Sequence, residues 1–140
     1  MAEALEGHCL CGAVKITVRS HEHGTSACHC SMCRRWSGAA QWGFEAPVDA
    51  VEISGPVQLY QSSEFAERAW CNDCGTHLWL RDSGAAYELL PGLFDSARDM
   101  PLVREVYADQ AFACAALSGD HRRVTRAEYQ ASNRFVEDTL

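Results

Sequence analysis

The chain has 140 residues, of which 47% are hydrophobic and 22% charged, and its formal net charge is -7. These values are ordinary for a soluble globular protein, and the length suits a single domain over residues 1–140. The acidic balance argues against a nucleic acid partner and against docking on an anionic membrane, because both require a basic face. No apolar run approaches the roughly 18 residues that span a bilayer.

The start of the chain and its cysteines indicate a compartment. Residues 1–7 include Glu3 and Glu6 and lack the apolar stretch of a signal peptide, so we expect none. The default location is then cytoplasmic, where thiols stay reduced. Eight cysteines in that setting favour metal binding over disulfides, while the composition indicates no particular oligomeric state.

Seven short segments have the features of β-strands. The alternation is clearest in residues 13–19, where Val14, Ile16 and Val18 alternate with polar side chains. Six further segments, mostly bounded by Gly, Pro, Asp or Ser, are residues 41–44, 51–53, 57–60, 77–81, 87–90 and 103–107. So many short strands within about 100 residues predict an all-β fold of packed antiparallel sheets.

Two helices are expected beside these strands. Thr125 and Glu128 fit a capping box, followed by apolar residues at helical spacing, so we predict a C-terminal helical extension over about residues 122–137. A shorter helical turn is expected over residues 31–36. Four arginines are interpreted as a solvent-facing side of the C-terminal helix: Arg122, Arg123, Arg126 and Arg134.

The cysteines carry the strongest functional signal. Seven of them fall in three clusters, namely Cys9 with Cys11, then Cys28, Cys30 and Cys33, then Cys71 with Cys74. The first and last clusters together supply the four thiolates of a closed tetrahedral zinc site. The middle cluster supplies three, which leaves one coordination position open for chemistry.

The proposed closed site depends on two turns. Cys71 and Cys74 can grip one ion if the chain turns sharply, and Gly75 allows the positive φ that such a turn often needs. Cys9 and Cys11 face the same way in an extended segment. The alternative is ordinary buried or disulfide-linked cysteine. A second alternative pairs the first cluster with the middle one, which leaves the last cluster short of ligands.

The proposed open site has candidate residues around it. A soft, thiolate-rich site with a vacancy suits a sulfur ligand. His29 is a candidate fourth ligand, although in an extended segment it points away from its neighbours, and it could instead carry protons. Arg34 and Arg35 could screen the anionic site or bind a substrate carboxylate, or they could simply face solvent. Cys114, among small apolar residues, is expected to be a buried structural thiol.

Three motifs together resemble one known family. They are Gly-His-Cys-Leu-Cys-Gly-Ala-Val from residue 7, Cys-His-Cys-Ser-Met-Cys-Arg-Arg-Trp-Ser-Gly from residue 28, and Trp-Cys-Asn-Asp-Cys-Gly-Thr-His from residue 70. In order and spacing they resemble the glutathione-dependent formaldehyde-activating enzymes, a family that includes the centromere protein V relatives. The resemblance covers about residues 7–107, which we take as the core of the domain.

The resemblance implies an Mss4-like fold and two zinc ions. The structural ion would be bound by Cys9, Cys11, Cys71 and Cys74, and the substrate-side ion, expected to be only partly occupied, by Cys28, Cys30 and Cys33. It also implies carbon-sulfur lyase activity that forms S-hydroxymethylglutathione from glutathione and formaldehyde, with a small thiol as partner. The alternatives are a non-catalytic carrier of a thiol adduct and a zinc-stabilised binding module.

Overall fold

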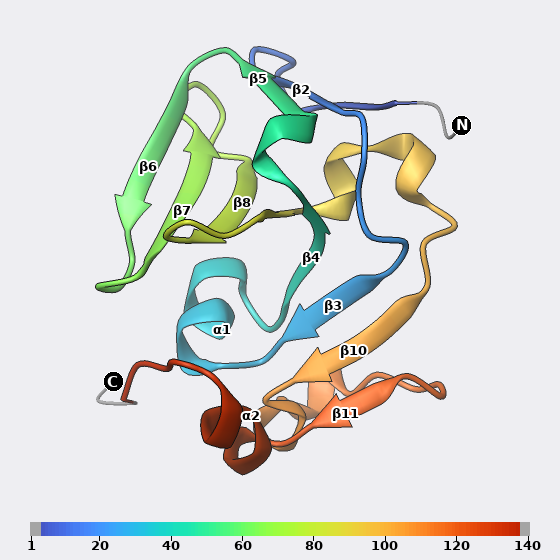
Figure 1. Ribbon diagram of the computed structural model, residues 1–140, viewed down its shortest axis with the longest axis vertical. Helices are drawn as coiled ribbons and strands as arrows, with labels where there is room; N and C mark the ends of the chain where they lie inside the picture. Colours follow the sequence, from blue (N-terminus) through green and yellow to red (C-terminus); the bar gives the residue numbers. More distant parts are fainter. Residues whose placement is uncertain (1–3, 138–140) are drawn as a thin grey trace. The chain divides into compact units, whose positions relative to one another are not determined.

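The computed structural model describes residues 4–137, which form two compact units (Figure 1). The first unit comprises the chain up to His23 together with Gly43–Met100. The second comprises Gly24–Trp42 together with the chain from Pro101 onward. Neither α-helix within the described range is long and apolar enough to cross a membrane.

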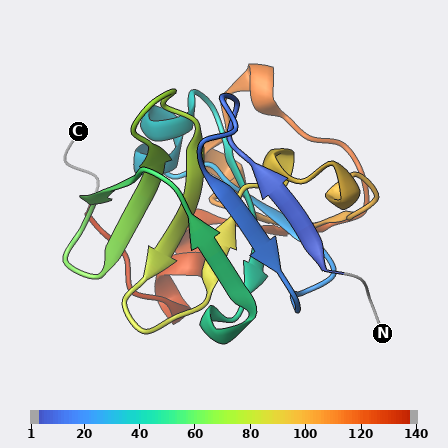
Figure 2. The ribbon, with the colours of Figure 1, turned by 90° about the horizontal axis from the view of Figure 1, so that it is seen from above.

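The first unit contains an antiparallel sheet of three strands. In spatial order they are β1 (Leu5–His8), β2 (Lys15–Val18) and β5 (Val51–Ser54). In the central strand, Ile16 pairs with Gly7 on one side and with Ile53 on the other. Figure 2 shows the two blue strands and the green β5 side by side. The turn between β1 and β2 contains the first cysteine cluster.

Five further strands pair antiparallel in a second sheet, and all but the first two residues of β4 (Gln41–Ala46) belong to the same unit. Their spatial order is β4, β9 (Tyr87–Leu89), β8 (His77–Asp82), β7 (Ala66–Cys71) and β6 (Val57–Gln61). Short 3-10 helices follow β4 and β9, namely η1 (Val48–Ala50), η2 (Pro91–Leu93) and η3 (Asp95–Ala97). The turn between β7 and β8 contains the last cysteine cluster.

Side chains of both sheets form the core of this unit. Ile16, Phe44, Leu78 and Phe94 are fully buried, and the rings of Phe44 and Phe94 meet edge-on at 5.4 Å. Each such side chain contributes about 1.5–3 kcal/mol by leaving water. Gly7 faces this core so closely that an added Cβ would lie 2.5 Å from the Phe94 ring. The strand that leads into the first cysteine turn is therefore held directly against the core.

The second unit is built on three parallel strands. β10 (Leu102–Val106) lies between β3 (Thr25–Cys28) and β11 (Arg122–Val124), as Figure 1 shows. The helices of this unit are α1 (Ser31–Ser37), η4 (Ala108–Gln110), η5 (Ala113–Ala115) and α2 (Arg126–Ser132). Antiparallel pairing was expected throughout, but the alternation of side chains is the same in parallel strands, so the sequence does not separate the two cases.

The predicted all-β class with a short C-terminal helix is confirmed, and its details differ in places. All seven predicted strands are present, whereas β1, β3, β7 and β11 were not predicted, because their charged, small or glycine residues weaken the β pattern. The Thr125 capping box is confirmed. The helical extension over residues 122–137 is wrong in extent, because the arginine-containing segment Arg122–Val124 pairs with β10 as a strand. That the chain forms one domain stays a prediction.

Candidate metal centres

Four thiols of the first unit converge on one point. Cys9 and Cys11 lie in the turn after β1, Cys71 ends β7, and Cys74 lies in the turn before β8. All four Sγ atoms lie within 4.8 Å of one another. The separations are 3.6 Å between the Sγ atoms of Cys9 and Cys11, and 3.9 Å between those of Cys11 and Cys71.

These separations fit a tetrahedral metal. Four sulfurs bound at about 2.3 Å from zinc lie about 3.8 Å apart along each edge of the tetrahedron. The donor set therefore suits a zinc ion.

The four thiols differ in their surroundings. The pKa values of Cys9 and Cys74 are lowered, whereas burial raises the pKa of Cys71. At Cys11, a hydrogen bond from the Ala13 backbone is outweighed by burial and the neighbouring thiols, which raise the pKa to about 12. The backbone N–H of Val14 donates to Cys9 Sγ at 3.3 Å. Hydrogen bonds from the Thr76 hydroxyl and backbone lower the pKa of Cys74 to about 6.

Both cysteine turns are closed by a hydrogen bond from a glycine N–H. The N–H of Gly12 donates to the carbonyl of Cys9 at 3.0 Å, and the N–H of Gly75 donates to that of Cys71 at 2.8 Å. Both glycines have positive φ, 82° and 79° respectively. The role predicted for Gly75 is thus present, because a φ in this range is strained for L side chains.

Thr76 joins the two turns and was missed by the sequence analysis. Its Oγ1 accepts a hydrogen bond from the backbone N–H of Leu10 at 3.0 Å and lies 3.1 Å from Cys74 Sγ. A hydroxyl two residues after the last cysteine is the signal that could have identified it. The closed cluster therefore includes a hydrogen bond that fixes the first turn against the last.

Three thiols of the second unit form the other cluster. Cys28 ends β3, Cys30 is the N-cap residue of α1, and Cys33 lies buried in the first turn of that helix. Their Sγ atoms lie within 4.8 Å of one another, and no other described histidine, cysteine or carboxylate joins the group. The cap bond runs from the N–H of Cys33 to Cys30 Sγ at 3.3 Å. The helix therefore turns the third thiol back toward the first two, as the spacing predicts.

The three thiols share protons unequally, and negative charge is favoured on the sulfur of Cys30. Hydrogen bonds from the thiols of Cys28 and Cys33, helped by the amides of Cys33 and Met32, lower the pKa of Cys30 to about 2. The same sharing raises the pKa of Cys28 well above its ordinary value. One thiolate is thus held by two thiol protons. A divalent cation can take the place of those protons, so this donor set also fits a metal.

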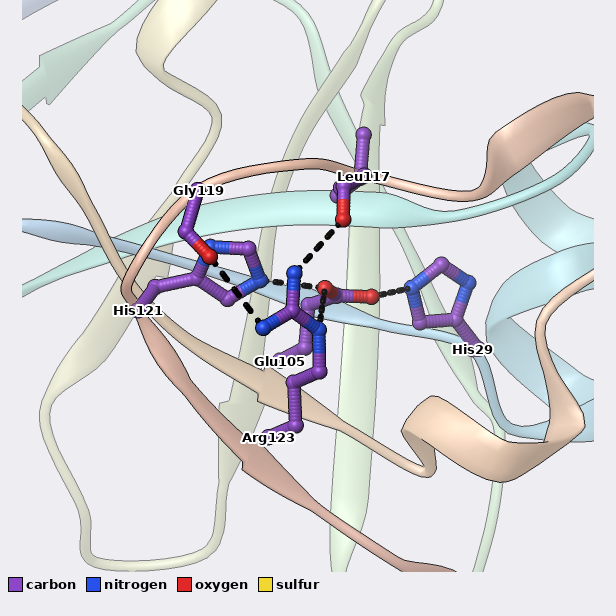
Figure 3. Close-up of polar contacts among 6 residues, drawn as sticks. All are labelled: His29, Glu105, Leu117, Gly119, His121 and Arg123. Atoms are coloured by element: carbon purple, nitrogen blue, oxygen red, sulfur yellow. Dashed lines mark hydrogen bonds and ion pairs between the residues drawn. The ribbon is translucent and has the colours of Figure 1, made fainter.

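His29 does not point at the thiols. Its side chain is fully buried, and its Nε2 lies 2.7 Å from Oε2 of Glu105 in a hydrogen bond. The structure therefore places His29 with a carboxylate instead of in the coordination shell. Figure 3 shows that Glu105 also contacts His121 and Arg123, on the opposite side from His29. The sequence analysis missed Glu105, because a lone charged residue in a short strand ordinarily faces solvent.

The two predicted arginines differ in orientation. The guanidinium carbon of Arg34 lies 4.5 Å from the centre of the Phe112 ring, and its Nε is buried without a hydrogen-bond partner. Arg35 is exposed and donates from Nη1 to the carbonyl of Ser31 on its own helix. Arg34 is therefore stacked on an aromatic ring, whereas Arg35 is bonded to its own helix. Phe112 was not predicted as part of this arrangement.

The expectation for Cys114 is wrong, because its thiol is exposed. It lies in η5, a single 3-10 turn in which only Ala115 is buried. The small apolar residues of this turn therefore leave the thiol exposed.

Comparison with known proteins relates the chain to one family. Residues 4–110 match the family described as glutathione-dependent formaldehyde-activating enzyme. Over 53% of the chain the sequence is 39% identical to an uncharacterized lyase of Schizosaccharomyces pombe, and over 56% it is 33% identical to a Halomonas elongata protein. The name of the latter provisionally assigns it to the glutathione-dependent formaldehyde-activating enzymes.

The chain spans just over half the length of these two relatives, 55% and 56% respectively. A crystal structure of a Rhodobacter sphaeroides protein matches 71% of this chain and 100% of its own, with 26% identity and a TM-score of 0.57. The fold is therefore shared with a protein of known structure.

Proposed function

This chain belongs to the glutathione-dependent formaldehyde-activating enzyme family, and on that premise we propose that it is a carbon-sulfur lyase acting on a thiol adduct of formaldehyde. The observation that carries the proposal is the cluster of Cys28, Cys30 and Cys33, three converging thiols that no fourth described side chain completes. The thiol substrate we propose is glutathione or a close analogue, and the location we propose is the cytoplasm, where free thiols persist.

The two clusters take different roles in this proposal. Cys9, Cys11, Cys71 and Cys74 hold a structural zinc ion, supported by sulfur separations that match a tetrahedron. Cys28, Cys30 and Cys33 hold a second zinc ion. When bound, that ion supplies an open coordination position at which a substrate thiol loses its proton.

Arg34 orients the substrate in this account. Its guanidinium has five N–H donors in a fork that matches a carboxylate. Stacking on Phe112 fixes the plane of the fork, and the buried Nε has no protein partner to displace. Arg34 lies on α1, the helix that also carries Cys33, and we propose that a carboxylate bound to it belongs to the same substrate as the reacting sulfur. Arg35, bonded back to its own helix, contributes positive charge.

The reaction that these residues would promote is an addition. The substrate sulfur, as thiolate, attacks the carbonyl carbon of formaldehyde and a carbon-sulfur bond forms. The electron pair of the carbonyl π bond moves to oxygen, which takes a proton from solvent and becomes the hydroxyl of S-hydroxymethylglutathione. Reversal breaks the same carbon-sulfur bond. Holding the thiolate and the carboxylate together lowers the entropic part of the barrier.

Exchange spectroscopy tests this function. The zinc-loaded protein is added to glutathione and 13C-formaldehyde at equilibrium, and NMR follows exchange between free and adduct forms. We expect faster exchange than the spontaneous rate, lost in Cys30→Ser and retained in Cys114→Ser, the exposed thiol that serves as a matched control. Absence of acceleration with every thiol tried would contradict the proposal. Tight thiol binding without acceleration would identify a carrier instead.

A further inference from the structure

Glu105 is a buried carboxylate surrounded by basic side chains. Its side chain is 3% exposed, and its two oxygens are taken by different partners, Oε2 by His29 Nε2 at 2.7 Å and Oε1 by His121 Nε2. Arg123 approaches Oε1 with its Nε at 3.6 Å. Both histidines are themselves at most 2% exposed on their side chains. Figure 3 shows the carboxylate between them.

Burying such a group is costly for the fold. A charge removed from water gives a stable arrangement only when it is paired and hydrogen-bonded, and apolar residues of similar volume often do as well or better. Burial by itself would raise the pKa of Glu105, but hydrogen bonds from His121 and His29 outweigh it, and the pKa is lowered. The carboxylate is therefore held ionised, and a role beyond stability would account for its cost.

The network reaches the open cluster, which consists of Cys28, Cys30 and Cys33, through His29. This residue stands between Cys28 and Cys30, and its backbone N–H donates to the carbonyl of Val106 at 2.9 Å. In the same ladder, Val106 pairs with Cys28. His29 is thus fixed at its backbone by β10 and at its ring by Glu105. Loss of the Glu105 contact would free the His29 ring, and a backbone shift at His29 would displace the two residues that flank it, Cys28 and Cys30.

The far side of the network comes from the C-terminal part of the chain. Arg123 donates from Nη2 to the carbonyl of Leu117 at 2.8 Å and from Nη1 to that of Gly119 at 3.2 Å. These bonds fold residues 117–123 around His121. The match to the family ends at residue 110, so this segment lies outside the part of the chain that the family shares.

We propose that Glu105 is a positioning residue for the open thiol cluster, acting through His29, and that residues 117–123 complete its network. The inference rests on the proposed function in one respect, the assignment of a metal to Cys28, Cys30 and Cys33. Side chains hydrogen-bonded behind a metal's ligands commonly change metal affinity by about 10–100-fold when mutated. Here the linkage runs through the backbone between two ligands.

Metal titration tests the inference without reference to turnover. Co2+ is added to the full chain in competition with a chromophoric chelator. The equivalent of bound Co2+ that is present in the parent protein and missing in Cys30→Ser is assigned to the open site. We expect Glu105→Gln and His121→Ala to lower the Co2+ affinity of the open site by roughly 10-fold. The same variants should shift the thiolate-to-cobalt charge-transfer band of that site. The other equivalent, at the closed site, should keep its affinity.

Conservative and matched variants separate positioning from folding. His121→Gln should restore much of the affinity, because its amide N–H can still donate to Glu105. Arg123→Gln should weaken the open site, whereas Arg122→Gln, on the same strand with an exposed side chain, should not.

Equal affinities and identical spectra in the parent protein, Glu105→Gln and His121→Ala would overturn the inference. Parallel loss of both equivalents without rescue by His121→Gln would also overturn it, in favour of a purely structural role. The Co2+ affinity of the open site could fall selectively in these variants while the parent protein does not accelerate the exchange between free formaldehyde and its glutathione adduct. That result would support the inference and contradict the proposed function. Binding of a single equivalent by the parent protein would overturn both.

Discussion

The guanidinium of Arg34 stacks on the ring of Phe112, with 4.5 Å between the guanidinium carbon and the ring centre. The ring is 48% exposed, and the Nε of Arg34 is buried without a partner. A guanidinium stacked in this way keeps its N–H edge available for an anion, and the stacking itself contributes about 0.5–1 kcal/mol at an exposed site. We propose that this pair recognises a substrate carboxylate.

Replacing Arg34 should separate substrates by their carboxylates. We expect Arg34→Lys to raise KM for glutathione by roughly 10-fold, because lysine lacks the planar fork that binds a carboxylate with two hydrogen bonds. Steady-state or exchange kinetics with cysteamine, a thiol without a carboxylate, should show little change. Arg35→Lys is the matched control. Equal losses for both thiols would contradict a role in carboxylate binding.

Substitutions of cysteines in the two clusters should affect different properties, stability in one case and activity in the other. Cys71→Ser removes a ligand of the closed site and should lower the free energy of unfolding by several kcal/mol, because zinc binding is coupled to folding. Cys30→Ser should abolish thiol exchange with a much smaller loss of stability. Denaturant unfolding and exchange NMR on both variants measure the split. Similar stability losses in the two would contradict the division of roles.

A side chain at Gly75 should lower the stability of the protein through the backbone conformation of this residue. Its φ is 79°, and an added Cβ would meet nothing within 4 Å, so the cost of Gly75→Ala is backbone strain alone. We expect a loss of about 1–2 kcal/mol in the free energy of unfolding. Gly92→Ala is the control, since Gly92 also has open space around it and no positive φ. An unfolding free energy unchanged by Gly75→Ala would show that the cysteine turn does not depend on this conformation.

Acid should weaken the Glu105 network. The folded-state pKa of Glu105 is lowered, so its contribution to stability is present above the unfolded value, about 4.3, and is lost as the pH falls through the folded value. The difference in unfolding free energy between the parent protein and Glu105→Gln should therefore shrink below about pH 4. Glu52→Gln, at an exposed ion pair with Arg19, is the control. A difference constant from neutral pH to pH 3 would contradict this assignment.

The two thiol clusters could be predicted because each group of cysteines has a recognisable local spacing. Cys28, Cys30 and Cys33 lie within six residues, and a helical turn at Cys30 is enough to bring them together. Cys9 and Cys71 are distant in sequence, but each pair is incomplete alone, so tetrahedral coordination itself specifies the partner. The need for four ligands therefore predicted the long-range contact between Cys9 and Cys71, which the periodicity of the sequence does not predict.

The surroundings of the open cluster could not be predicted in this way. Glu105 meets His29 and His121 only because β10 pairs in parallel with both β3 and β11, and strand alternation does not encode that order. Phe112 reaches Arg34 from a loop with no regular pattern. Residues that assist the ligands therefore became visible only in the structure.

The most direct test of the account is whether a substrate sulfur joins the three thiols of Cys28, Cys30 and Cys33. Cobalt-loaded protein is titrated with glutathione and, separately, with S-methylglutathione, while the thiolate-to-cobalt charge-transfer absorption is recorded. The account predicts that glutathione increases this absorption, that S-methylglutathione does not, and that Cys30→Ser removes the response. An absorption that glutathione leaves unchanged would contradict the claim that the open cluster receives the substrate.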